Sequence, residues 1–256
     1  MINKTQGILI LAGVILIQLF YFGFDTVQMD KDLEIEGTEP EVSENIDISH
    51  RIEDAVKTLS ADDRDSAVAW MDRAETGNIH TLKQLTSFWV SKGKWVLAGH
   101  YSEQIARQEP SSENWAMAAN TFATGAGQVE EAEDRTFLSQ KALSLYNKAI
   151  EMSQDPFPLE LKKTLHMISH PVGGNPMGGI QALMQLSEKY PDRPEVFFQL
   201  GRFAVQTGQW EKAQERLERA NELAPENKST ICLLTDVYEQ LGNKEKAAEY
   251  RERCNQ

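Results

Sequence analysis

Apolar residues recur three and four positions apart through most of the chain, beginning near residue 48. This spacing places them on one face of an α-helix and predicts amphipathic helices that bury a single stripe. The first two stripes predict a leading helical hairpin over residues 48–78, and they contain Ile48, Ile52, Val56, Leu59, Ala67, Val68, Trp70, Met71 and Ala74.

Residues 7–24 break this pattern, because all 18 are uncharged and only Gln18 carries a polar amide. A helix of that length spans about 27 Å, close to the hydrocarbon thickness of a bilayer. Its C-terminal end is rich in aromatic residues, as is typical of the membrane interface. We expect a single transmembrane helix in an anchor formed by residues 1–24. A cleavable signal peptide is the alternative, although residues 25–28 offer no small-x-small cleavage site.

The charges that flank this segment predict its orientation. Lys4 and the terminal amine precede it, and no basic residue follows until Lys31. The positive-inside bias then predicts a cytoplasmic N-terminus and the rest of the chain across the membrane. In a bacterium, the chain is expected in the inner membrane, with its folded part in the periplasm.

Residues 25–47 carry nine acidic side chains and one basic side chain, and they predict a solvated, extended linker. Much of the formal net charge of −13 lies in or near this segment. The rest of the chain has an ordinary mixed-charge composition without a basic excess, which argues against binding to a nucleic-acid backbone.

A 34-residue period follows, and it sets the spacing of Pro191 from Pro225 and of Gly208 from Gly242. The clearest copy spans residues 194–227. Its key positions are Phe197, Leu200, Gly201, Ala204, Gly208, Ala213, Leu217, Ala220 and Pro225. This pattern resembles the tetratricopeptide repeat family, in which each unit is a helix–turn–helix hairpin. Small residues at positions such as Gly201 are expected to let the two helices approach closely.

The resemblance extends over residues 79–256 in about five units, the second of which has an insertion near residues 129–140. It implies an all-α solenoid of helical hairpins preceded by the transmembrane helix, with residues 48–78 as a degenerate cap. The layout of anchor, acidic linker and repeats is similar to that of bacterial membrane-anchored tetratricopeptide repeat proteins.

The residues that suggest chemistry have structural explanations in this pattern. His166 and His170 share a helix face, but no third ligand is evident, so we predict no metal site. The glycine-rich run at residues 173–179 lacks the Lys-Ser/Thr ending of a phosphate-binding loop and predicts a turn between helices. We therefore expect no catalytic residues and no cofactor.

Cys232 and Cys254 lie near the start of one helix and the end of its partner in the last unit. An oxidising compartment would allow a disulfide that ties down this hairpin. Two free, buried thiols are the alternative.

The resemblance implies that proteins or peptides bind in a concave groove lined by the first helix of each unit. Matching positions are Lys83, Asn120, Phe198 and Arg202. Phe198 and Arg202, one turn apart, would offer an aromatic–cation contact to an extended peptide, or would pack against the next unit instead. The expected function is a membrane-tethered scaffold for protein–protein interaction in the periplasm. A narrower alternative is an accessory factor of cytochrome c maturation or envelope biogenesis that binds unfolded clients; an enzyme is a less favoured reading.

Overall fold

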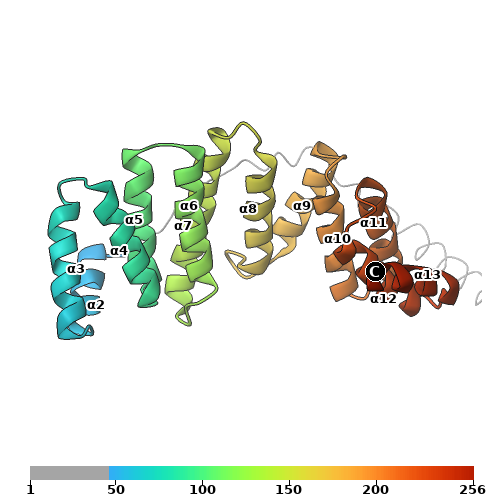
Figure 1. Cartoon of the computed structure of the whole chain (residues 1–256), viewed down its shortest axis with the longest axis horizontal. Helices are drawn as coiled ribbons and strands as arrows, with labels where there is room; N and C mark the ends of the chain where they lie inside the picture. Colours follow the sequence, from blue (N-terminus) through green and yellow to red (C-terminus); the bar gives the residue numbers. More distant parts are fainter. Residues whose placement is uncertain (1–45) are drawn as a thin grey trace, which may run out of the picture. The chain divides into compact units, whose positions relative to one another are not determined.

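The computed structural model describes residues 46–256, which fold into helices and loops without a strand in that range (Figure 1). The expected membrane span at 7–24 and nearly all of the acidic linker at 25–47 lie outside the described residues. No helix within residues 46–256 is both long and apolar enough to cross a bilayer. The described helices are α2 (Ile48–Lys57), α3 (Ala61–Ala74), α4 (Ile79–Ser91), α5 (Trp95–Gln108), α6 (Ser112–Ala126), α7 (Ala132–Glu151), α8 (Phe157–Ser169), α9 (Met177–Lys189), α10 (Pro194–Gln206), α11 (Trp210–Leu223), α12 (Lys228–Gln240) and α13 (Lys244–Asn255).

Consecutive helices pair as hairpins from α4 onward, in the order α4–α5, α6–α7, α8–α9, α10–α11 and α12–α13. Each hairpin then packs on the next, so the described part of the chain is an all-α array of the kind that the 34-residue period predicts. In the region expected to cap this array, α3 packs on α4, while α2 lies against α5 as well as α3. The second helix of the unit with extra residues, α7, has 20 residues, against 14 in both α5 and α11.

Three hairpins turn through a glycine in the left-handed region of φ. Gly93, Gly208 and Gly242 have φ values of 67°, 68° and 74°. In the turn at Gly208, the amide of Gln209 donates to the carbonyl of Ala204 at 2.9 Å, and equivalent bonds close the other two turns. This arrangement satisfies carbonyls that the end of the first helix leaves without partners. The turn positions expected from the glycine spacing are thus confirmed.

The two helices of the 194–227 unit approach each other at Gly201, as expected. A Cβ atom at this position would lie 2.5 Å from Cγ of Leu217. Leu217 is fully buried, as is Ala213 on the same helix. Because the small side chains of Gly201 and Ala213 leave room, Leu217 fills the space between α10 and α11 and joins the core of the last two hairpins.

We expect Gly201→Ala to destabilise the protein by about 1–3 kcal/mol, because the new methyl group overpacks the contact with Leu217. Gly178→Ala is the matched control, since a Cβ on Gly178 meets nothing within 4 Å. Alanine has a higher helix propensity than glycine, so the control substitution is expected to leave the stability unchanged or to raise it slightly. Urea unfolding followed by circular dichroism measures both variants, and equal stability of the two would contradict the packing argument.

Candidate functional site

The four residues expected in a concave groove come from three first helices, and they do not converge on one pocket among those described. Lys83 on α4 and Arg202 on α10 are exposed. Asn120 on α6 accepts a hydrogen bond of 2.7 Å from Oη of Tyr146, which ties its side chain to α7. Phe198 packs against the core shared by the last two hairpins. The guanidinium of Arg202 lies 5.1 Å from the ring centroid of Phe203, the next residue along the helix.

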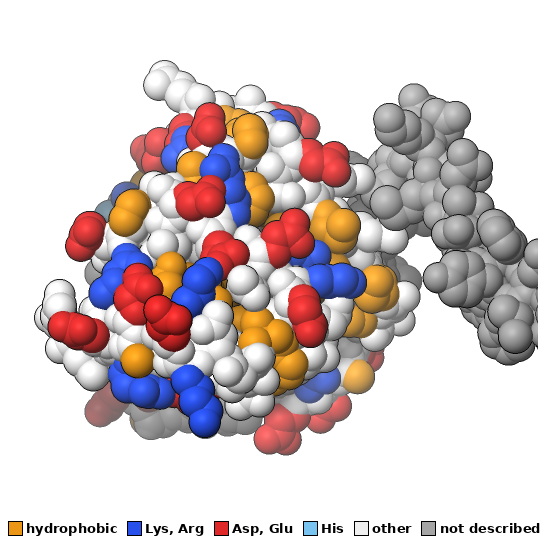
Figure 2. All heavy atoms as spheres, turned by 90° about the vertical axis from the view of Figure 1, so that its right-hand side faces the viewer, with side chains coloured by type: hydrophobic (Ala, Val, Ile, Leu, Met, Phe, Trp, Pro, Cys, Tyr) orange, Lys and Arg blue, Asp and Glu red, His pale blue; other side chains and the backbone are white. Residues whose placement is uncertain are grey.

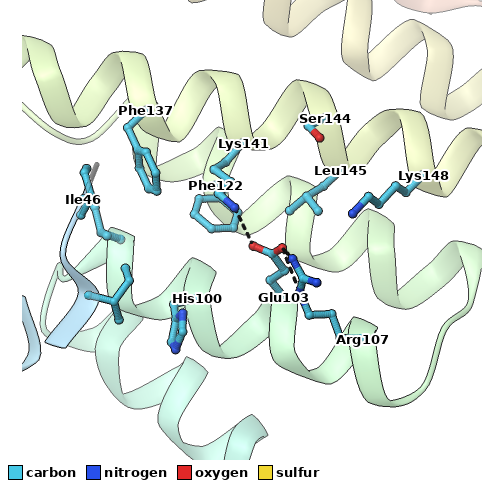
Figure 3. A pocket seen from close by; sticks show the side chains of 12 residues that line it. Ile46, His100, Glu103, Arg107, Phe122, Phe137, Lys141, Ser144, Leu145 and Lys148 are labelled. Atoms are coloured by element: carbon cyan, nitrogen blue, oxygen red, sulfur yellow. Dashed lines mark hydrogen bonds and ion pairs between the residues drawn. The ribbon is translucent and has the colours of Figure 1, made fainter. Parts of the chain in front are cut away.

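A different pocket, of about 450 Å³, lies between α5 and α7, which are the second helices of the first two units (Figure 3). This volume is in the range of sites that bind ligands or partner side chains. Sequence reasoning missed the pocket because it considered only first helices. Its lining residues are Ile46, Ile48, Val96, His100, Glu103, Arg107, Phe122, Phe137, Lys141, Ser144, Leu145 and Lys148.

Glu103 holds the polar side of this pocket together. Its carboxylate accepts hydrogen bonds from Arg107, one turn along α5, and from Nζ of Lys141 on α7 at 3.3 Å. Figure 3 shows both cations directed at the single carboxylate. Burial alone would raise the pKa of Glu103, but the charges of Lys141 and Arg107 outweigh it and hold the pKa below its ordinary value. The carboxylate is therefore charged at neutral pH and is paired within the pocket.

Lys148 supplies a third cation to the pocket. It follows Lys141 by two helical turns on α7, and its ammonium lies 4.7 Å from the ring centroid of Trp115. The pocket lining thus has three basic side chains and one acidic side chain. Burial lowers the pKa of His100 more than the charge of Glu103 raises it, so His100 adds no charge at neutral pH.

The apolar side of the pocket depends on a close approach between two units. A Cβ atom on Gly99 of α5 would lie 2.4 Å from the ring of Phe122 on α6. Because Gly99 has none, Phe122 reaches under α5 and borders the pocket next to Val96. Its ring centroid lies 6.3 Å from that of Phe137 on α7, edge to face, which is a favourable aromatic geometry.

His166 and His170, at the C-terminal end of α8, contact α7 through Ser139. Their rings stack with centroids 4.9 Å apart. Oγ of Ser139 lies 2.9 Å from Nε2 of His166 and donates to the carbonyl oxygen of His170, also at 2.9 Å. Burial and the neighbouring His170 lower the pKa of His166 to about 4. Within the described residues, no third metal-ligating side chain joins the two rings.

The last hairpin contains the two cysteines and a charged cluster. Cys232 on α12 and Cys254 on α13 form a disulfide in the structure, with Cα atoms 5.0 Å apart. Nζ of Lys246 on α13 lies 3.1 Å from both Tyr238 on α12 and Glu218 on α11 of the preceding hairpin. The end of the array seen in Figure 2 has acidic and basic side chains interspersed with hydrophobic ones. This surface has no large region of a single charge sign.

Comparison with known proteins supports the interpretation of the repeats. The tetratricopeptide repeat family model matches residues 194–227, which form α10, α11 and the loop that follows. The chain contains a tetratricopeptide repeat. The resemblance inferred from Gly201, Gly208 and Ala213 is thereby confirmed. No sequence among curated proteins matches the chain.

Solved structures that match the chain do so at low identity and with TM-scores below 0.5. A MamA fragment from Desulfovibrio magneticus RS-1 is 16% identical, with a TM-score of 0.47 over 69% of this chain and 92% of that one. PilW, a type IV pilus biogenesis factor, is 16% identical, with a TM-score of 0.46 over 80% and 90% of the two chains. YrrB, described as having an unusual peptide-binding site, is 15% identical, with a TM-score of 0.41 over 73% and 91%. At these identities and scores, nothing about a partner follows for this chain.

The pKa of His166 predicts a pH dependence of stability. The ordinary pKa of histidine is 6.5, and the value in the folded protein is about 4, so the unfolded chain binds the proton more readily. The contribution of His166 to stability is complete above pH 6.5 and is lost as the pH falls toward 4. Glutamine does not titrate, so the His166→Gln variant is expected to lose less stability between pH 6.5 and pH 4 than the wild type does. The difference in the free energy of unfolding is expected to reach up to about 3 kcal/mol.

Chemical denaturation at a series of pH values between 7 and about 4 measures this effect. His80→Gln on α4 replaces an exposed histidine and is the matched control, which is expected to keep the wild-type pH dependence. If the free energy of unfolding depends on pH in the same way in wild type and His166→Gln, then folding does not disfavour protonation of His166.

Proposed function

We propose that this chain is a membrane-tethered scaffold that binds other proteins through its tetratricopeptide repeat array on the periplasmic side. The array itself carries the first part of the proposal. Successive hairpins with a repeat match at 194–227 present rows of side chains from separate helices on a continuous surface. Such surfaces recognise partners by shape and charge complementarity, and a membrane anchor raises the local concentration of partners.

Exposed first-helix side chains give this surface its candidate contacts. Lys83 on α4 and Arg202 on α10 both extend into solvent, and Asn120 lies between them along the chain with its amide nitrogen available to donate. These groups come from different hairpins, so a partner that contacts all of them is an extended polypeptide.

Site-specific photo-crosslinking in membranes tests the scaffold role. A photoreactive residue in place of Lys83 or Arg202 is expected to capture the same partner protein. Lys212 is the control position, because it is exposed on α11, a second helix, and it is expected to give little of that product. Equal capture at all three positions, or none at any, would contradict binding through the first helices.

The proposed topology rests on the uncharged segment 7–24, on Lys4 before it and on the two cysteines. Cys232 and Cys254 have a backbone separation suited to a disulfide, and such bonds persist in oxidising compartments such as the periplasm. These are the only cysteines in the chain, so their redox state reports on the compartment of the last hairpin.

Thiol trapping in bacteria that express the chain tests this topology. After acid quenching of whole cells, both cysteines are expected to resist alkylation until a reductant is added. A variant that lacks residues 7–24 is the control, and it is expected to remain in the cytoplasm with two free thiols. Free thiols in the full-length protein, together with protection of the repeats from protease added to spheroplasts, would reverse the proposed orientation.

A further inference from the structure

The pocket between α5 and α7 combines cations with apolar side chains. Its lining has three basic side chains and one acidic side chain, an excess of two positive charges. The basic side chains Arg107, Lys141 and Lys148 border the pocket together with Phe122, Phe137 and Leu145. A pocket with an apolar lining and a few converging charged groups indicates a binding surface.

The apolar part of the pocket suits one or two large side chains of a ligand. Phe122, Phe137 and Leu145 are almost fully buried as residues, yet all three border the pocket. They are held in place by the core shared by α6 and α7, so the floor is preformed. Because the floor belongs to packed helices, an entering side chain displaces water without reordering the protein.

The charged part of the pocket suits carboxylates. Glu103 already accepts hydrogen bonds from Arg107 and Lys141, and it is therefore not free to attract a cation. The side chain of Arg107 remains 60% exposed and that of Lys141 26% exposed, so both keep donors for a second acceptor. Lys148, two turns further along α7, extends the basic side in the direction of the helix.

We propose that this pocket on the second helices binds an acidic segment of a partner protein, in which large apolar side chains are flanked by Asp or Glu. The apolar side chains enter the floor at Phe122 and Phe137, and the flanking carboxylates pair with Lys141, Lys148 and Arg107. Charge complementarity selects this occupant, because the basic residues outnumber the one acid of the lining. This site rests on the proposed scaffold function and deepens it by adding a second surface, formed mainly by the second helices α5 and α7, apart from the first-helix positions Lys83 and Arg202.

Binding of a defined probe to the full-length chain in nanodiscs tests the proposal. The probe is a fluorescein-labelled decapeptide amide with a central Leu-Phe pair between two runs of Glu, and fluorescence anisotropy measures its Kd. A peptide with Gln in place of Glu is the ligand control and is expected to bind at least about tenfold more weakly. Raising the salt concentration is expected to weaken the Glu peptide more than the Gln peptide.

Variants of the pocket then locate the binding site. Lys148→Glu is expected to raise the Kd of the Glu peptide by about tenfold or more, because one ion pair is lost and a like charge is introduced. Lys141→Gln is a second variant that keeps a hydrogen-bond donor near Glu103, and it is expected to raise the Kd by a smaller factor. Lys162→Glu makes the same charge change at an exposed position of α8 outside the pocket and is expected to leave the Kd unchanged. Circular dichroism checks that each variant is folded.

Three results would overturn the pocket assignment. Equal affinity for the Glu and Gln peptides excludes recognition of carboxylates, and an unchanged Kd in both pocket variants places the binding elsewhere. The affinity for the Glu peptide could also rise more than about tenfold when the acidic residues of segment 25–45 are changed to Gln or Asn, or when dimers of the chain are diluted. Either rise means that this chain itself occupies the pocket.

Loss of peptide binding in Lys148→Glu with unchanged photo-crosslinks at positions 83 and 202 supports the pocket as a second surface. Failure of those crosslinks with peptide binding intact removes the proposed groove function instead.

Discussion

Close contact between helices at glycine is the constraint on which the described structure depends. At Gly99, Gly179 and Gly201, a methyl group would collide with a side chain or the backbone of a neighbouring helix. The contact at Gly201 lies within one hairpin, whereas that at Gly99 joins one hairpin to the next. A hairpin cannot bury both of its faces alone, so the array needs contacts between units, such as that at Gly99, as well as contacts within a hairpin, such as those at Gly179 and Gly201.

The candidate pocket is a consequence of the same constraint. Phe122 reaches the floor only because Gly99 lets α6 approach α5, and this approach also sets how α7 lies beside α5. Glu103 on α5 then meets Lys141 on α7 at hydrogen-bonding distance. A buried carboxylate is costly unless it is paired, so the ion pair and the apolar contact must form together. The pairing of Glu103 with Lys141 is therefore positioned by the packing of the helices, whereas the side chain of Arg107 remains 60% exposed.

The local features of the fold could be predicted from the sequence, because they depend on residues near one another in the chain. A glycine after a helix favours the left-handed turn seen at Gly208, and the 34-residue period identifies the hairpins. The pocket could not be predicted in this way. The sequence shows the spacing of Glu103 from Arg107 and of Lys141 from Lys148, but this spacing indicates only that each pair shares a helix face. Which faces meet depends on how consecutive units pack and on the longer helix α7.

Phe198 and Arg202 show how packing treats two side chains that the sequence places one helical turn apart. That separation would let both face a bound peptide, but Phe198 packs against the core shared by the last two hairpins. Burial of an aromatic ring is worth more than an exposed contact between a cation and a ring. Arg202 is then left with the neighbouring ring of Phe203, which it meets at 5.1 Å. Of the two residues, packing therefore leaves Arg202 the more exposed to solvent.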